Sequence, residues 1–90
     1  MSKRTEAMSE MFIVKNFHSK PCKEFVAGVQ DGFGFVECNL LRSGIIMIIP
    51  LVRKKRDECM EDMIRNAGKE DYQDYLLGFM AVLDHCLKEH

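Results

Sequence analysis

The sequence predicts an α+β fold, in which a small sheet of two or three strands is covered by about three helices, the last of them long and amphipathic. Residues 45–49 are apolar on both sides, which is typical of a buried strand, and residues 12–17 are rich in aromatic and β-branched side chains. Residues 69–90 instead carry apolar side chains at alternating spacings of four and three, which is typical of a helix. An all-α fold is the alternative.

Length and composition indicate one small globular domain. The chain has 90 residues, of which 47% are hydrophobic and 30% are charged. A chain of this size has room for one modest core and not for a cleft between two domains. Residues 1–10 are polar and lack a usable apolar stripe, so we expect them to form a mobile leader in front of a single domain of residues 11–90.

Charge and cysteine content indicate a cytoplasmic protein. The formal net charge is −1, so no overall field would drive the chain onto nucleic acid or anionic lipid. No secretory leader precedes the four cysteines, which favours a reducing compartment where they remain free thiols. The longest uncharged run, residues 43–52, is too short to cross a bilayer, which needs about 20 apolar residues. We therefore expect no membrane partner.

The first elements in chain order are predicted to be a strand and a helix. Residues 12–17 favour the strand. Ser19 and Pro21 then stand where a helix start places a capping serine and a proline in the first turn. The helix is expected over residues 20–30, and the pair at positions 31 and 32, an aspartate and a glycine, is expected to end it.

The middle of the chain is ambiguous between strand and helix. Residues 33–41 contain apolar side chains that fit one side of a helix, but the segment also begins as an alternating, aromatic run. Gly34 is costly inside a helix, and residues 42–44 have the composition of a turn into the apolar run 45–49. We therefore expect two strands here, with Pro50 at the end of the second.

The second half of the chain predicts two helices. One is expected to begin near Asp57 and to close at Ala67, because the acidic residues after position 56 complement the helix dipole whereas the cations of residues 53–56 oppose it. The alternative makes Pro50 the first residue of a helix that extends to Ala67.

The final helix is expected over residues 69–90. Gly68 separates it from the preceding helix, acidic Glu70 and Asp71 stand in its first turn, and Gly78 inside it is expected to allow a close backbone contact. Its apolar stripe is too wide to face water, so it must pack on this chain or on a second copy. The central residues of the stripe are Tyr72, Leu76, Phe79, Leu83 and Cys86.

The sequence shows no constellation of residues that an enzyme or a metal site requires. The four cysteines lie far apart without a C-x2-C pair, and the glycines form no phosphate-binding motif, so we expect no metal and no cofactor. Cys22 is the one candidate nucleophile, because it lies near a predicted helix start between Lys20 and Lys23, with His18 nearby. A thiol-dependent enzyme using Cys22 is the third hypothesis.

The most concentrated charge in the chain is the basic block formed by Arg53, Lys54, Lys55 and Arg56. Such a block could hold a phosphate backbone, which gives the second hypothesis, a nucleic-acid-associated regulator. Against it, acidic residues follow the block directly and no aromatic residues are interleaved with the cations to stack on bases.

The first hypothesis is a homodimeric, non-enzymatic protein-interaction module. It would be an adaptor, regulator or inhibitor of a larger protein. Its partner would be another protein or a second copy of itself, recognised by the apolar face of the final helix. The partner-binding residues predicted on that face are Tyr72, Tyr75, Phe79 and Met80.

Overall fold

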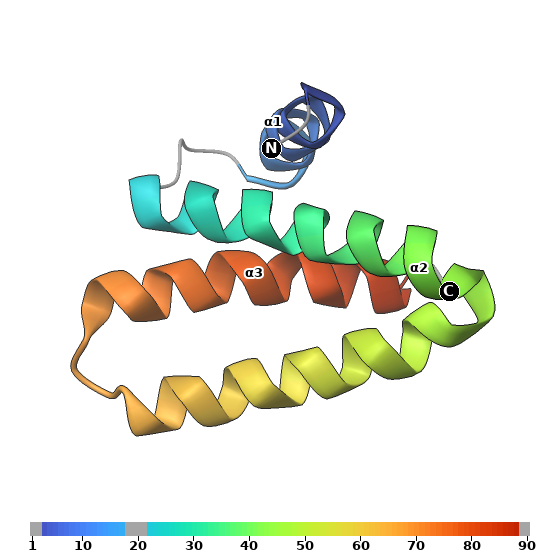
Figure 1. Cartoon of the computed structure of the whole chain (residues 1–90). Coiled ribbons are helices and arrows are strands. Elements are labelled where there is room, and N and C mark those ends of the chain that lie inside the picture. Colours follow the sequence, from blue (N-terminus) through green and yellow to red (C-terminus); the bar gives the residue numbers. More distant parts are fainter. Residues whose placement is uncertain (1–2, 18–21, 89–90) are drawn as a thin grey trace.

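The computed structural model describes residues 3–17 and 22–88, apart from the side chains of residues 3–5, 43 and 45. It contains helix α1 at Lys3–Asn16, helix α2 at Lys23–Arg65 and helix α3 at Glu70–Lys88 (Figure 1). Gly44 interrupts α2 with a non-helical backbone, at φ 78° and ψ 172°. We call residues 23–43 the first arm of α2 and residues 45–65 the second arm.

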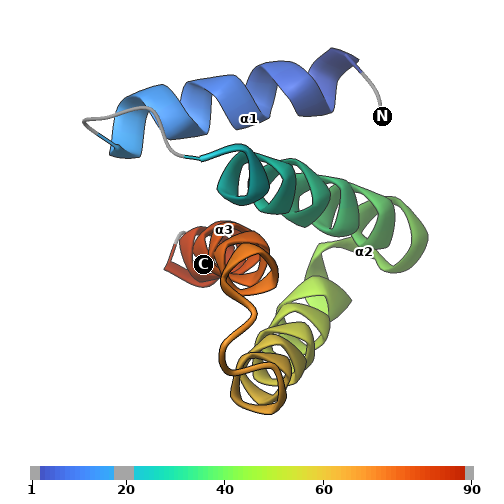
Figure 2. The ribbon, with the colours of Figure 1, turned by 90° about the vertical axis from the view of Figure 1, so that its left-hand side faces the viewer.

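The two arms and α3 form a three-helix bundle. The chain runs along the first arm, reverses at Gly44, returns along the second arm and reverses again into α3, which lies between the arms (Figure 1). Figure 2 looks along the bundle and shows these three helices at the corners of a triangle, with α1 running across the first arm. Only α1 therefore lies outside the bundle and touches it with one face.

The core forms on the two sides of α3. One cluster joins Leu76, Met80 and Leu83 of α3 to Ile48 and Val52 of the second arm. A smaller cluster joins α1, the first arm and α3 through Phe12, Val29 and Val82. The predicted final helix is thus confirmed. The middle of its stripe is buried by this same chain at Leu76, Phe79 and Leu83, whereas Tyr72 at its start is 39% exposed.

The first arm and α3 approach each other backbone to backbone at glycines. A Cβ atom at Gly78 would lie 2.1 Å from the carbonyl oxygen of Phe25, and a Cβ atom at Gly28 would lie 1.9 Å from the carbonyl oxygen of Tyr75. No side chain larger than hydrogen fits at either position without moving a helix. The close contact predicted for Gly78 is confirmed.

The predicted sheet is wrong, and with it the α+β class: the described residues contain helices and no strand. Residues 12–17 fall in α1 and just after it, and residues 33–36 and 45–49 lie inside the two arms of α2. Packing decides the outcome, because Ile48 and Val52 stand four apart and turn one helical face toward α3. β-Branched composition alone could not indicate this, since strand propensity depends on what the side chains pack against.

Two predicted helix boundaries also differ from the structure, and a third falls outside the described residues. The first predicted helix does not end at residues 31–32, and the helix predicted to begin at Asp57 begins just after Gly44, with Pro50 inside it. Ser19 and Pro21 lie outside the described residues; α2 begins after Cys22, whose side chain makes no capping bond.

Two further expectations concern the amino terminus and membrane-spanning helices. α1 already includes residues 3–10, where a mobile leader was expected. Across the described ranges, no helix is both long and apolar enough to cross a bilayer.

Candidate functional site

Helix α1 uses one face to hold itself against the bundle. Ser9 and Phe12 are buried on this face, and the ring of Phe12 meets the rings of Phe17, Phe33 and His85 edge to face at centroid distances of 6.0, 5.5 and 5.2 Å. These contacts anchor α1 to the first arm and to α3. Its opposite face is therefore free of any role in the core.

That opposite face, which we call the α1 outer face, is apolar at its centre. Met11 and Val14 stand three residues apart on this face and are 72% and 80% exposed. A shallow hollow of about 440 Å³ lies on this face and is lined by Glu10, Met11, Val14 and Lys15. An apolar line flanked by one acid and one base on a helix is the arrangement of a helix-pairing surface.

The four predicted partner-binding residues of α3 are mostly enclosed by this chain. Phe79 and Met80 are buried at 7% and 8% exposure, Tyr75 is partly buried and Tyr72 is 39% exposed. A partner would reach Phe79 or Met80 only if the arms moved apart. The partner-binding role of these residues stays a prediction, and only the two tyrosines offer surface for it.

The two tyrosines link α3 to both arms. Their rings stack at a centroid distance of 6.2 Å, the Tyr72 hydroxyl donates to the carboxylate of Asp62 at 3.4 Å, and the Tyr75 hydroxyl donates to the carboxylate of Asp31. Burial, followed by the bond to Asp31, raises the pKa of Tyr75 far above its ordinary value. These contacts stabilise the seam between α3 and the arms.

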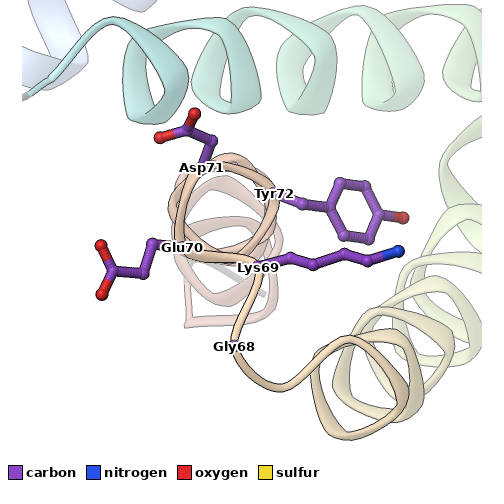
Figure 3. Close-up of a pocket in the computed structure, with 5 residues that line it drawn as sticks. All are labelled: Gly68, Lys69, Glu70, Asp71 and Tyr72. Carbon is purple, nitrogen blue, oxygen red and sulfur yellow. The ribbon is translucent and has the colours of Figure 1, made fainter.

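A second hollow, of about 430 Å³, lies at the start of α3 and is lined by residues 68–72 (Figure 3). Figure 3 shows Lys69 and Tyr72 pointing together toward the space between the arms, whereas Glu70 points away from it. Glu70 and Asp71 already place negative charge at the positive end of the helix dipole. The hollow therefore does not suit a phosphate or another anion.

Lys55 of the basic block is partly buried and packs against the bundle. Its Nζ lies 5.7 Å from the ring centroid of Phe35 and 5.5 Å from that of Phe79, and 3.9 Å from a carboxylate oxygen of Glu58. One cation thus joins the first arm, the second arm and α3. It does not reach outward as a nucleic-acid contact.

Arg56 is also engaged within the chain, because its Nε pairs with the carboxylate of Asp84 on α3. Arg53 and Lys54 are exposed. Two of the four cations of the basic block, Lys55 and Arg56, thus make contacts within the chain, and the nucleic-acid hypothesis depends mainly on Arg53 and Lys54.

The cysteines do not assemble a reactive or metal-binding site in the part of the chain that the structure describes. Cys22 is exposed, and its Sγ donates to the carboxylate of Asp74 at 3.6 Å; His18 lies outside the described residues. Cys59 is buried, and burial raises the pKa of its thiol. Within the described ranges, no three His, Cys, Asp or Glu side chains come close enough together to hold an ion.

A further apolar surface surrounds the bend of α2, and we call it the elbow. Leu40 and Leu41 stand before Gly44 and are 42% and 82% exposed, and Ile46 and Met47 stand after it at 85% and 53%. This surface cannot be found from the sequence while residues 45–49 are assigned to a buried strand. The available signal was that the longest uncharged run in the chain contains a glycine near its start.

Comparison of the chain with protein-family models, with curated proteins and with solved structures finds no match.

Proposed function

We propose that this protein is a non-enzymatic, homodimeric interaction module of the cytoplasm, an adaptor, regulator or inhibitor of a larger protein. The observation that carries the proposal is the α1 outer face, an exposed apolar line on a helix whose other face is already anchored. The second copy of the chain is the partner that this face fits.

The solvent-accessible area of the chain supports an interface of standard size. The chain exposes 6337 Å², about 900 Å² more than the roughly 5,400 Å² that surface scaling gives for a compact monomer of 10.4 kDa. A standard interface takes about 800 Å² from each partner. The excess is therefore close to what one side of a dimer buries.

The charges on the α1 outer face are self-complementary in one orientation. Met11 and Val14 stand three apart, as do positions a and d of a heptad, and Glu10 and Lys15 then occupy the flanking positions g and e. Two parallel copies of α1 place each Glu10 beside the Lys15 of the other copy. An antiparallel pair would instead place like charges together, so the charges favour the parallel arrangement.

Charge reversal on this face tests the proposal. Wild-type protein should show a concentration-dependent mass between monomer and dimer in sedimentation equilibrium. Glu10→Lys and Lys15→Glu should each weaken self-association, because each places like charges across the interface. An equal mixture of the two variants should associate again, since each helix then meets the opposite charge.

Two results would overturn the homodimer. One is wild-type protein that remains monomeric at every concentration, and the other is a mixture of the two variants that associates no better than either alone. Lys54→Glu, a charge reversal on the exposed side of the second arm, is the matched control and should leave self-association unchanged.

The nucleic-acid alternative has a separate test. If the basic block binds phosphate backbones, the wild-type protein should be retained on heparin at low salt and Arg53→Ala with Lys54→Ala should elute earlier. Passage of the wild-type protein without retention removes this alternative.

A further inference from the structure

The elbow is an exposed apolar tip at one end of the molecule (Figure 1). The bend of α2 lies at the end of the bundle where α3 also finishes, away from α1 (Figure 1). Leu41 and Ile46, on the two sides of Gly44, are 82% and 85% exposed, more than any other large apolar side chain of the described residues. Neither side chain contributes to the core, so both remain available to bind a lipid bilayer or another molecule.

The segment of α2 that contains the elbow is basic. Residues 38–56 contain five cations and no acidic residue, although the whole chain is slightly acidic. Three of these cations, Arg42, Arg53 and Lys54, are exposed. An apolar tip with a basic surround is the pattern by which proteins bind the surface of an anionic bilayer.

We infer that the elbow docks on the surface of a membrane that carries anionic lipid. Leu41 and Ile46 enter the boundary between headgroups and acyl chains, and the exposed cations contact lipid phosphates. An anionic bilayer fits better than a protein, because Arg42, Arg53 and Lys54 are exposed cations that can contact lipid phosphates while Leu41 and Ile46 enter the apolar layer. The absence of a spanning helix does not bear on this mode, which needs only side chains at a surface.

This inference does not depend on the dimer. α1 lies on a different side of the molecule from the elbow, so its outer face and the elbow can be occupied at the same time (Figure 1). Dimer formation would place two elbows in one particle and strengthen the membrane contact through avidity.

The chain contains no tryptophan, which allows a single reporter to be placed at the elbow. Ile46→Trp should shift its emission to shorter wavelength when phosphatidylcholine vesicles containing phosphatidylserine are added, and less with phosphatidylcholine alone. Val14→Trp, at an equally exposed position on α1, is the matched control and should show no vesicle-dependent shift. Raising the salt concentration should release the protein.

Sedimentation with the same vesicles supplies the second measurement. Ile46→Asp should reduce the bound fraction by about tenfold or more, because it removes an apolar group and adds a negative charge. Since the side chain at this position is almost fully exposed, the variant should keep the wild-type melting temperature. Arg53→Glu with Lys54→Glu should weaken binding to the anionic vesicles specifically.

Three results would overturn the inference: wild-type protein that does not sediment with anionic vesicles at low salt, binding that Ile46→Asp leaves unchanged, or a vesicle-dependent shift at Val14→Trp equal to that at Ile46→Trp. An Ile46→Trp emission that shifts with protein concentration and not with lipid would assign the elbow to a contact between protein molecules.

Discussion

The close contact between the first arm and α3 predicts that two glycines cannot be replaced by alanine. A methyl group at Gly28 would lie 1.9 Å from the carbonyl oxygen of Tyr75, and one at Gly78 would lie 2.1 Å from that of Phe25. Both obstacles are backbone atoms, which cannot rotate away as the end of a side chain can. The helices must separate by an amount on the order of 1 Å to restore ordinary van der Waals contact.

The expected loss of stability in Gly28→Ala and Gly78→Ala follows from two opposing effects. Overpacking of a core costs about 1 to 3 kcal/mol, and the rigid obstacle places these sites near the upper limit. Replacing a helical glycine by alanine returns about 1 kcal/mol through helix propensity. Gly28→Ala and Gly78→Ala should therefore each lower the free energy of unfolding by about 2 kcal/mol, which for a domain of this size lowers the melting temperature by about 8 to 16 °C.

Gly34 provides the matched control on the same arm. A methyl group there meets no atom within 4 Å, so Gly34→Ala should show only the propensity gain and should raise the melting temperature. Thermal and urea unfolding followed by far-ultraviolet circular dichroism measure all three variants. If Gly28→Ala and Gly34→Ala change stability in the same direction, the first arm and α3 are not packed backbone to backbone and the bundle described above is incorrect.

Three further predictions concern single side chains. Leu83→Ala should cost about 2 to 5 kcal/mol in urea unfolding because Leu83 is fully buried, whereas Leu77→Ala on an exposed side of α3 should cost far less. The raised pKa of Tyr75 means that the folded state keeps a proton that the unfolded chain loses, so stability should fall as the pH rises above about 10, and Tyr75→Phe should reduce this fall. Iodoacetamide should label Cys22 no faster than Cys38, which is also exposed; much faster labelling of Cys22 would revive the thiol-dependent hypothesis.

The final helix could be predicted from the sequence because every local signal agreed with its periodicity. Glu70 and Asp71 open it, Gly68 adopts a φ of 96° just before it, and its apolar residues keep a helical spacing to the end. Residues 33–49 could not be assigned in the same way. Gly32 and Gly34 are typical of helix breakers in the sequence, yet Gly32 lies where the first arm meets Val82 of α3 and has a packing reason to be small.

The candidate surfaces were harder to predict than the helices. The α3 stripe was expected to meet a partner, but the arms of the same chain cover Phe79 and Met80. The α1 outer face was hidden by the strand assigned to residues 12–17, because alternation in a strand does not place Met11 and Val14 on one face. Once the segment is helical, the same residues and their flanking charges define a pairing surface.

Gly44 connects the fold to the proposed membrane contact. A φ of 78° is strained for any residue with a side chain, so glycine at this position permits the sharp reversal that brings the two arms against α3. The reversal also turns Leu41 and Ile46 outward. Full burial of two such side chains is worth about 3 to 6 kcal/mol, and three cations near an anionic surface add about 3 kcal/mol. Since neither contribution alone gives stable attachment against the entropy of binding, the contact should require both the apolar tip and anionic lipid.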